Sequence, residues 1–152
     1  MTEATAAPPP LPPGTALPPL ALAIVIPAYQ EGATIAGLVA RMRAVVPEVP
    51  PLVVDDGSTD VTAREARMAG AEVLALPANQ GKGAALRQGM RAALAGGAGY
   101  VATLDGDGQH RPEDLPRLLA LARPDRIVIG SRRRATGQPA ARRRANRVAD
   151  FW

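Results

Sequence analysis

Short apolar runs alternate along the chain with longer segments whose apolar residues recur at helical spacing. The runs predict five strands, over residues 21–26, 52–54, 72–76, 100–104 and 126–129. The segments between them predict four helices, over residues 33–46, 60–69, 82–95 and 112–122. In the first of these, Ile35, Leu38, Val39 and Met42 fall on one helical face. A regular alternation of strand and helix is therefore expected.

Local signals predict where several of these elements begin and end. Pro27 is expected to close the first strand, because proline has no N–H to donate to a sheet. Ser58 or Thr59 is expected to cap the helix over 60–69, and Gly70 to end it. Pro112 suits the first turn of the last helix.

The alternation predicts an α/β fold with a mostly parallel sheet and helices on both faces. In such sheets ligands bind beyond the carboxyl ends of the strands. The 152 residues suit one domain, and 47% hydrophobic residues suffice for a core. Because only 3% of the residues are aromatic, this core is expected to be aliphatic.

Composition excludes several classes of site. The absence of cysteine excludes disulfides, cysteine-ligated metals and a thiol nucleophile, and the single His110 excludes a multi-histidine metal site. No run of 18 apolar residues is present, so no transmembrane segment is expected. Residues 1–20 contain seven prolines and no signal-peptide pattern. They predict a disordered proline-rich tail, with a PxxP-type ligand as the less favoured alternative.

The positive charge is concentrated near the C-terminal end. Residues 131–147 contain seven arginines and no acidic residue, and removing these seven from the 18 basic residues leaves 11 against 14 acidic ones. Such a segment favours phosphate-bearing partners. A solvated basic linker and capture of a lipid phosphate at an anionic membrane surface remain equally favoured for it. Nucleic-acid binding is not expected, because no aromatic residues are interleaved with the arginines.

Four aspartates directly follow two of the predicted strands: Asp55, Asp56, Asp105 and Asp107. Carboxylates that share one sheet edge repel one another unless a cation or hydrogen-bond donors compensate. Such oxygen-rich sites suit Mg²⁺ or Mn²⁺, usually together with substrate phosphates. The alternative is that these residues only form turns, as Asp-Gly pairs often do. Two such clusters at matching strand ends favour the cation site.

Other phosphate- and cation-binding motifs are not matched. No G-x-G-x-x-G follows the first strand, and Lys82 lacks the flanking residues of a Walker loop. The segment from Asp105 begins like a calcium loop but has His110 at its sixth position and Pro116 at its twelfth.

Five motifs in order resemble those of family 2 glycosyltransferases of the GT-A fold. They are IVIPAYQE at 24–31, VVDDGSTD at 53–60, NQGKG at 79–83, LDGDGQH at 104–110 and IGSR at 129–132. The similarity is greatest to dolichyl-phosphate mannose synthases and bacterial polyprenyl-phosphate glycosyltransferases. It implies transfer of a sugar, with inversion, from a UDP- or GDP-sugar to a polyprenyl phosphate or similar acceptor, and dependence on Mg²⁺ or Mn²⁺.

The resemblance also implies roles for individual residues. Asp105, Gly106 and Asp107 would form the D-x-D motif that binds the donor, with both aspartates catalytic. Asp107 and Gln109 would hold the metal. The remaining donor- or acceptor-binding residues would be Pro27, Tyr29, Glu31, Val54, Asp56 and Arg132, with Asp56 on the base.

Some positions leave alternatives open. Gln30 stands where many family members have asparagine. For Lys82 a packing and loop role is favoured over a substrate contact, and His110 is expected to be a loop residue near the site. The resemblance implies a donor-binding domain over 21–132 and, over 133–152, the arginine-rich start of an acceptor region that is cut short. The expected location is the cytoplasm or the inner membrane face. A catalytically silent nucleotide-binding fragment and an anion-binding module remain alternatives.

Overall fold

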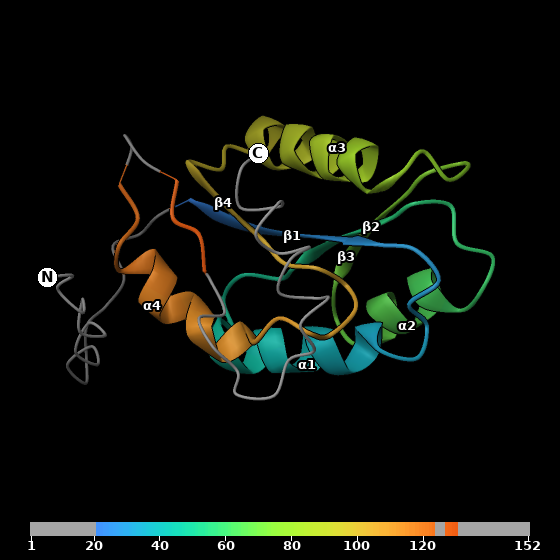
Figure 1. The fold of residues 1–152 in the computed structure, drawn as a ribbon, viewed down its shortest axis with the longest axis horizontal. Coiled ribbons are helices and arrows are strands. Elements are labelled where there is room, and N and C mark those ends of the chain that lie inside the picture. Colours follow the sequence, from blue (N-terminus) through green and yellow to red (C-terminus); the bar gives the residue numbers. More distant parts are fainter. Residues whose placement is uncertain (1–20, 124–126, 131–152) are drawn as a thin grey trace, which may run out of the picture. The chain divides into compact units, whose positions relative to one another are not determined.

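A computed structural model describes residues 21–123 and 127–130 of the chain. Within them, one parallel sheet has the strand order β3-β2-β1-β4 (Figure 1). The strands are β1 (Leu22–Ala28), β2 (Leu52–Asp55), β3 (Glu72–Ala75) and β4 (Tyr100–Thr103). The helices are α1 (Ile35–Val45), α2 (Thr62–Met68), α3 (Lys82–Ala95), the 3₁₀ helix η1 (Pro112–Asp114) and α4 (Leu115–Leu119). All of these elements belong to a compact unit that ends at Leu121; a second unit begins at Ala122.

Helices cover both faces of the sheet, as the sequence predicts. Helix α3 lies on one face, and α1, α2 and α4 lie on the other (Figure 1). Alternate side chains of β1 point to opposite faces of the sheet. Ile24 and Ile26 pack in the core under α1, whereas Val25 packs in the core under α3. The core is aliphatic, and the α/β fold class is confirmed.

The order of the strands places a crevice beside β1. The chain runs from β1 outward through β2 to β3, and then crosses back to place β4 on the other side of β1. Parallel strands direct their carboxyl ends to one edge, and ligands bind where the strand order reverses. The loops that follow β1, β2 and β4 therefore meet at that edge.

The first strand does not end at Pro27, contrary to the prediction. It continues to Ala28, and Pro27 stands opposite Val54 of β2. The carbonyl of Val25 accepts a hydrogen bond from Leu104, so Val25 faces β4, and Pro27, two residues later, faces the same side. Pairing with β4 ends at Val25. The missing N–H of Pro27 therefore costs no ladder hydrogen bond.

The start of α2 also differs from the prediction. The helix begins at Thr62, and neither Ser58 nor Thr59 caps it, because both hydroxyl oxygens accept hydrogen bonds from Gln30. Asp60 accepts the N–H of Thr62 instead, at 2.9 Å. Hydrogen bonds from Thr62 lower the pKa of the Asp60 carboxyl. At the other end, Gly70 has a φ of +92° after the last turn, as predicted.

In the C-terminal part, the last predicted helix is shorter than expected and the fifth predicted strand is absent from residues 127–130. The predicted helix over 112–122 divides into η1 and α4 and ends at Leu119. Residues 127–130 form no strand, and Ile127 and Ile129 are 89% and 81% exposed. An apolar run forms a strand only where a neighbouring strand pairs with it, and no such pairing is present for 127–130 among the described residues. Arg126 and the predicted boundary at residue 132 lie outside the described residues.

An exposed ion pair links α1 to η1. Arg41 donates two hydrogen bonds to Glu113, at 2.9 Å and 2.7 Å. They lower the pKa of Glu113 from 4.5 to about 2. A lowered carboxyl pKa stabilises the fold above pH 4.5, and this contribution is lost as the pH falls toward 2. Because both side chains are exposed, the contribution is small.

No helix within the described residues is both long and apolar enough to cross a membrane.

Helix α3 lies close to the sheet at Gly89. A Cβ there would come within 2.4 Å of Val25 Cγ1 and 2.7 Å of Val54 Cγ2. Both valines are fully buried and stiff at χ1, so they cannot move aside easily. We expect Gly89→Ala to destabilise the protein by about 1–3 kcal/mol, although alanine favours a helix by up to about 1 kcal/mol.

The control for this prediction is Gly37→Ala in α1, where nothing lies within 4 Å of the added Cβ. It should stabilise the protein by about 0.5–1 kcal/mol. Urea unfolding of both variants provides the measurement. A Gly89→Ala variant as stable as Gly37→Ala would show that α3 does not pack this closely.

Candidate functional site

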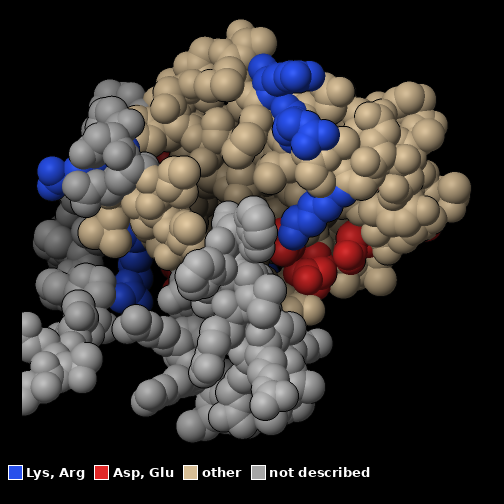
Figure 2. Space-filling model, turned by 45° about the horizontal axis from the view of Figure 1, so that its top comes forward, with Lys and Arg blue, Asp and Glu red and all other residues tan. Residues whose placement is uncertain are grey.

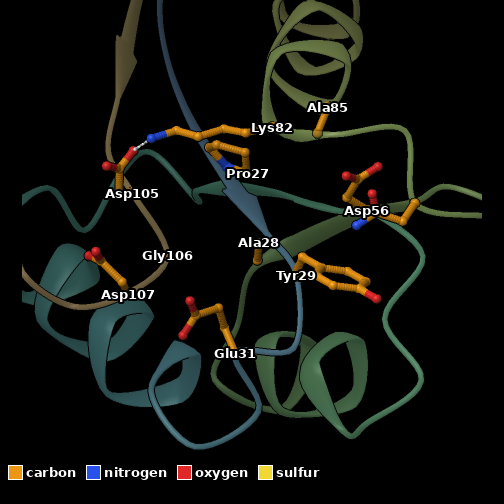
Figure 3. Close-up of a pocket in the computed structure, with 11 residues that line it drawn as sticks. Pro27, Ala28, Tyr29, Glu31, Asp56, Lys82, Ala85, Asp105, Gly106 and Asp107 are labelled. Atoms are coloured by element: carbon orange, nitrogen blue, oxygen red, sulfur yellow. Dashed lines mark ion pairs between the residues drawn. The ribbon is translucent and has the colours of Figure 1, made fainter. Parts of the chain in front are cut away.

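A cavity of about 300 Å³ lies at the carboxyl edge of the sheet. It is formed by the loops after β1, β2 and β4 together with the first turn of α3 (Figure 3). The lining residues are Pro27, Ala28, Tyr29, Glu31, Asp56, Asn79, Lys82, Ala85, Asp105, Gly106 and Asp107. Charged side chains thus meet over a floor made by the end of β1.

Hydroxyl and carboxylate side chains of residues 58–62 hold the loop after β1. The hydrogen bonds run from the main-chain N–H of Gln30 to Ser58, from that of Glu31 to Thr62, and from that of Gly32 to Asp60, at 2.9, 2.8 and 3.0 Å. Three consecutive amides are therefore fixed by side chains from the next loop. These bonds explain Ser58 and Asp60 of the second motif as parts of a clamp, with Thr62, on the segment that carries Tyr29 and Glu31.

Within this clamp, Gln30 adopts a left-handed backbone conformation. Its φ of +57° is the one positive value among the described non-glycine residues. Asparagine adopts this region more readily than glutamine. The side chain of Gln30 compensates by donating to Thr59 Oγ1 at 2.8 Å.

Asp56 holds the loop that leads into α3. Its carboxylate is buried and accepts the N–H groups of Gln80 and Gly81, both at 2.8 Å. Gly57 beside it has a φ of +71°, and a Cβ there would lie 2.5 Å from the main chain of Ala78. The Asp-Gly pair thus lets the loop over 77–81 cross close to the end of β2, which brings Lys82 to the cavity.

Asp105 is held by a lysine at its carboxylate and by a histidine at its main chain. Lys82 Nζ lies 2.6 Å from Asp105 Oδ1 (Figure 3). The main-chain N–H of Asp105 donates to His110 Nδ1 at 3.0 Å, which places the proton of a neutral His110 on Nε2. His110 therefore holds the backbone of Asp105, and Lys82 holds its carboxylate.

Of Asp105 and Asp107, Asp107 has the more accessible carboxylate. It is exposed, and its Oδ1 accepts one hydrogen bond, from the N–H of Gln109 at 2.9 Å. Between the two aspartates, Gly106 is buried, and a Cβ there would lie 3.1 Å from the carbonyl oxygen of Pro27. A side chain at this position would crowd the carbonyl of Pro27, because this loop packs directly on the end of β1.

Most of the predicted site residues meet in this cavity. Those that line it are Pro27, Tyr29, Glu31, Asp56, Asp105, Gly106 and Asp107. Gln109 is exposed, does not line the cavity and contacts Asp107 through its backbone. Asp55 also lies apart, buried and accepting the N–H of Ser58. Arg132 and the arginine run lie outside the described residues.

Val54, predicted as a nucleoside contact, does not line the cavity, and that role stays a prediction. It is fully buried in the core under α3, next to Gly89. Its position in the motif reflects packing of β2 against α3.

Lys82 and Asn79 are lining residues that the sequence interpretation did not place in the site. For Lys82 the sequence favours a packing and loop role over a substrate contact; in the structure its ammonium group pairs with Asp105 inside the cavity. The available signal was its place at the start of the predicted helix over 82–95, at the carboxyl edge of a parallel sheet.

The carboxylates present fit a divalent cation that is shared with a ligand. The described residues contain no group of three or more acidic, histidine or cysteine side chains able to enclose a metal by themselves. Mg²⁺ needs only one or two protein carboxylates when substrate phosphates supply further ligands. Asp105 and Asp107 provide that number, and a cation, the ammonium group of Lys82, already lies beside Asp105.

A family model described as glycosyl transferase family 2 matches residues 23–152. The chain belongs to this family. The undecaprenyl-phosphate mannosyltransferase of Micrococcus luteus is 41% identical over 114 residues, which are 72% of this chain and 47% of that protein. The polyprenol monophosphomannose synthase of Mycolicibacterium smegmatis is 36% identical over 79% of this chain and 48% of its own. The chain thus spans about half the length of these relatives and is related to polyprenyl-phosphate sugar transferases.

Solved structures agree with the GT-A-like fold of this family 2 chain. Glucosyl-3-phosphoglycerate synthase of Mycobacterium tuberculosis, in a complex with Mg²⁺ and UDP, is 31% identical with a TM-score of 0.53. The match covers 65% of this chain and 38% of that one. The same enzyme with Mn²⁺, UDP-glucose and phosphoglyceric acid matches with a TM-score of 0.54. The fold and family expected from the motifs are confirmed.

The hydrogen bonds from Gln80 and Gly81 to the Asp56 carboxylate should contribute to stability. We expect Asp56→Asn to destabilise the protein by about 1–3 kcal/mol, because an amide N–H would face a main-chain donor in place of an acceptor. Hydrogen exchange at Gln80 and Gly81 should accelerate. Urea unfolding and amide exchange measured by NMR test both effects.

The matched control is Asp107→Asn, which changes an exposed carboxylate with one hydrogen bond. Its stability should stay within about 0.5 kcal/mol of the unaltered protein. Equal stabilities for the two variants, with unchanged exchange at Gln80 and Gly81, would contradict the role assigned to Asp56.

Proposed function

We propose that this family 2 chain binds a UDP- or GDP-sugar in the cavity, together with Mg²⁺ or Mn²⁺, and transfers the sugar to a polyprenyl phosphate or similar acceptor. The observation that carries this proposal is the meeting of three strand-end loops around one cavity with Asp105 and Asp107 on one side. The names of the relatives and the Mg²⁺–UDP and Mn²⁺–UDP-glucose complexes of the related synthase support the chemical class.

The arrangement of the lining residues suggests how the donor would lie. Figure 3 shows Tyr29 and Asp56 on one side of the cavity and Asp105, Gly106 and Asp107 on the other. Tyr29 offers a flat apolar ring that can stack on a base, and the Asp56 oxygens have lone pairs left after two hydrogen bonds. We therefore place the base beside Tyr29 and Asp56 and the diphosphate beside the D-x-D motif.

Asp107 and Asp105 would hold the cation, with Gln109 as the further ligand that the family resemblance implies. When bound, a divalent cation neutralises the charge that develops on a departing diphosphate. The chain's contribution is to fix both carboxylates: Gly106 packs on the end of β1, and His110 holds the backbone of Asp105. Such fixed groups need little reorganisation during the reaction.

Transfer would proceed with inversion at the anomeric carbon. An oxygen of the acceptor phosphate attacks that carbon on the face opposite the diphosphate. The new carbon–oxygen bond forms as the old one breaks, and the nucleoside diphosphate leaves with the bonding electrons. Because the acceptor phosphate is already ionised, the attack needs no strong base from the protein. The polyprenyl chain of such an acceptor lies in a membrane, so we expect the protein to act at the membrane surface.

The donor-binding part of this proposal predicts metal-dependent nucleotide affinity. Calorimetric titration of UDP and GDP into the full chain should give binding with Mn²⁺ present, and binding should weaken at least tenfold when EDTA removes the metal. Asp107→Asn should cause a loss of similar size, because it removes one metal-binding carboxylate.

The control is Asp114→Asn, which removes an exposed carboxylate of η1 that does not line the cavity. It should leave nucleotide affinity within about twofold of the unaltered protein. Metal-independent binding, or equal losses in the two variants, would contradict the donor site. No binding of either nucleotide by a folded sample would overturn it.

A further inference from the structure

We propose that Lys82 is a built-in counter-cation of Asp105, which leaves this carboxylate when a divalent cation and a diphosphate enter the cavity. The exchange would make the binding of cation and nucleotide mutually dependent. This inference rests on the proposed function and concerns the same site.

The geometry favours a replaceable pair. Lys82 Nζ lies 2.6 Å from Asp105 Oδ1, and the two side chains are 63% and 34% exposed. Figure 3 shows the Lys82 side chain reaching across the top of the cavity from the start of α3. Exposed ion pairs contribute little free energy and are broken at little cost. Lys82 can therefore move without unfolding any element.

The position of Asp105 does not depend on Lys82. His110 Nδ1 accepts the main-chain N–H of Asp105, and Gly106 packs against Pro27. The main chain before Lys82 is fixed separately, since Gly81 donates to Asp56. Removing the ammonium group should consequently leave both loops in place.

Electrostatics makes the two cations compete at Asp105. An ammonium group at 2.6 Å occupies one carboxylate oxygen and repels a second cation nearby. A diphosphate entering beside the D-x-D motif would offer the Lys82 ammonium a new anionic partner at the N-terminal end of α3, where anions are also favoured. The nucleotide would thus relieve the competition, which by linkage raises the affinity for the cation.

Lys82 differs from the other basic residues of α3 in its position beside the cavity. Figure 2 shows a row of basic side chains over α3 that ends beside a group of acidic ones. The basic residues of α3 are Lys82, Arg87 and Arg91, and only Lys82 lines the cavity. Arg87 therefore provides a matched control for the loss of one positive charge from the same helix.

The test measures the affinity for Mn²⁺ alone, by electron paramagnetic resonance of free Mn²⁺, in the full chain. Lys82→Met should bind Mn²⁺ about threefold to tenfold more tightly than the unaltered protein, because the competing ammonium group is gone. Arg87→Met should change this affinity by less than about twofold. A merely structural role for Lys82 would lower the affinity, not raise it.

The second measurement repeats the Mn²⁺ titration with saturating UDP or GDP. In the unaltered protein the nucleotide should strengthen Mn²⁺ binding by a larger factor than in Lys82→Met. Lys82→Arg, which keeps a cation at this position, should retain most of the coupling. Unchanged or weaker binding of Mn²⁺ alone to Lys82→Met, or an equal gain in Arg87→Met, would overturn the exchange.

The two proposals fail in different ways. If the unaltered protein binds nucleotide with Mn²⁺ but Lys82→Met shows no gain for Mn²⁺ alone, the exchange is wrong and the donor site stands. If the unaltered, folded protein binds no nucleotide with Mn²⁺, the proposed function fails and the exchange fails with it.

Discussion

Carboxylates can share one edge of a sheet only if each is compensated, and this constraint organises the cavity. Asp56 is buried and is satisfied by two main-chain N–H groups of the loop before α3. Asp105 is satisfied by the ammonium group of Lys82. Asp107 is exposed and accepts one N–H from Gln109. Asp56 accepts two main-chain hydrogen bonds and Asp107 accepts one, so Asp56 also fixes the loop that shapes the cavity, whereas Asp107 is the most accessible of the three.

Close approach of main-chain segments is what brings these carboxylates together. Gly57 allows the loop before α3 to cross the end of β2, and Gly106 allows the D-x-D loop to pack on the end of β1. Side chains of residues 58–62 then fix the amides of 30–32. The motifs of the family are therefore largely contacts between loops. The same motifs also supply nearly all of the residues that line the cavity.

Much of this arrangement was predictable from sequence because it follows from periodicity and from strand polarity. Apolar spacing predicts the sheet and its covering helices, and the parallel order sends Asp56 and Asp107 to one edge. Properties that depend on a specific neighbour were not predictable. Pro27 stays in β1 because β4 has already ended beside it, and Val54 is buried because α3 lies close at Gly89. The pairing of Lys82 with Asp105 depends on how the loop before α3 crosses β2, which no local pattern reveals.

The central claim is that the loops after β1, β2 and β4 form one site for a cation and a diphosphate. Paramagnetic broadening of amide signals by Mn²⁺, recorded by NMR with UDP or GDP present, tests it most directly. Broadening should be strongest at residues 105–109 and should extend to Glu31 and Lys82, while the amino-terminal ends of the strands, such as Leu22 and Glu72, stay sharp. Broadening centred away from Asp107, or spread evenly over the acidic surface, would contradict the site.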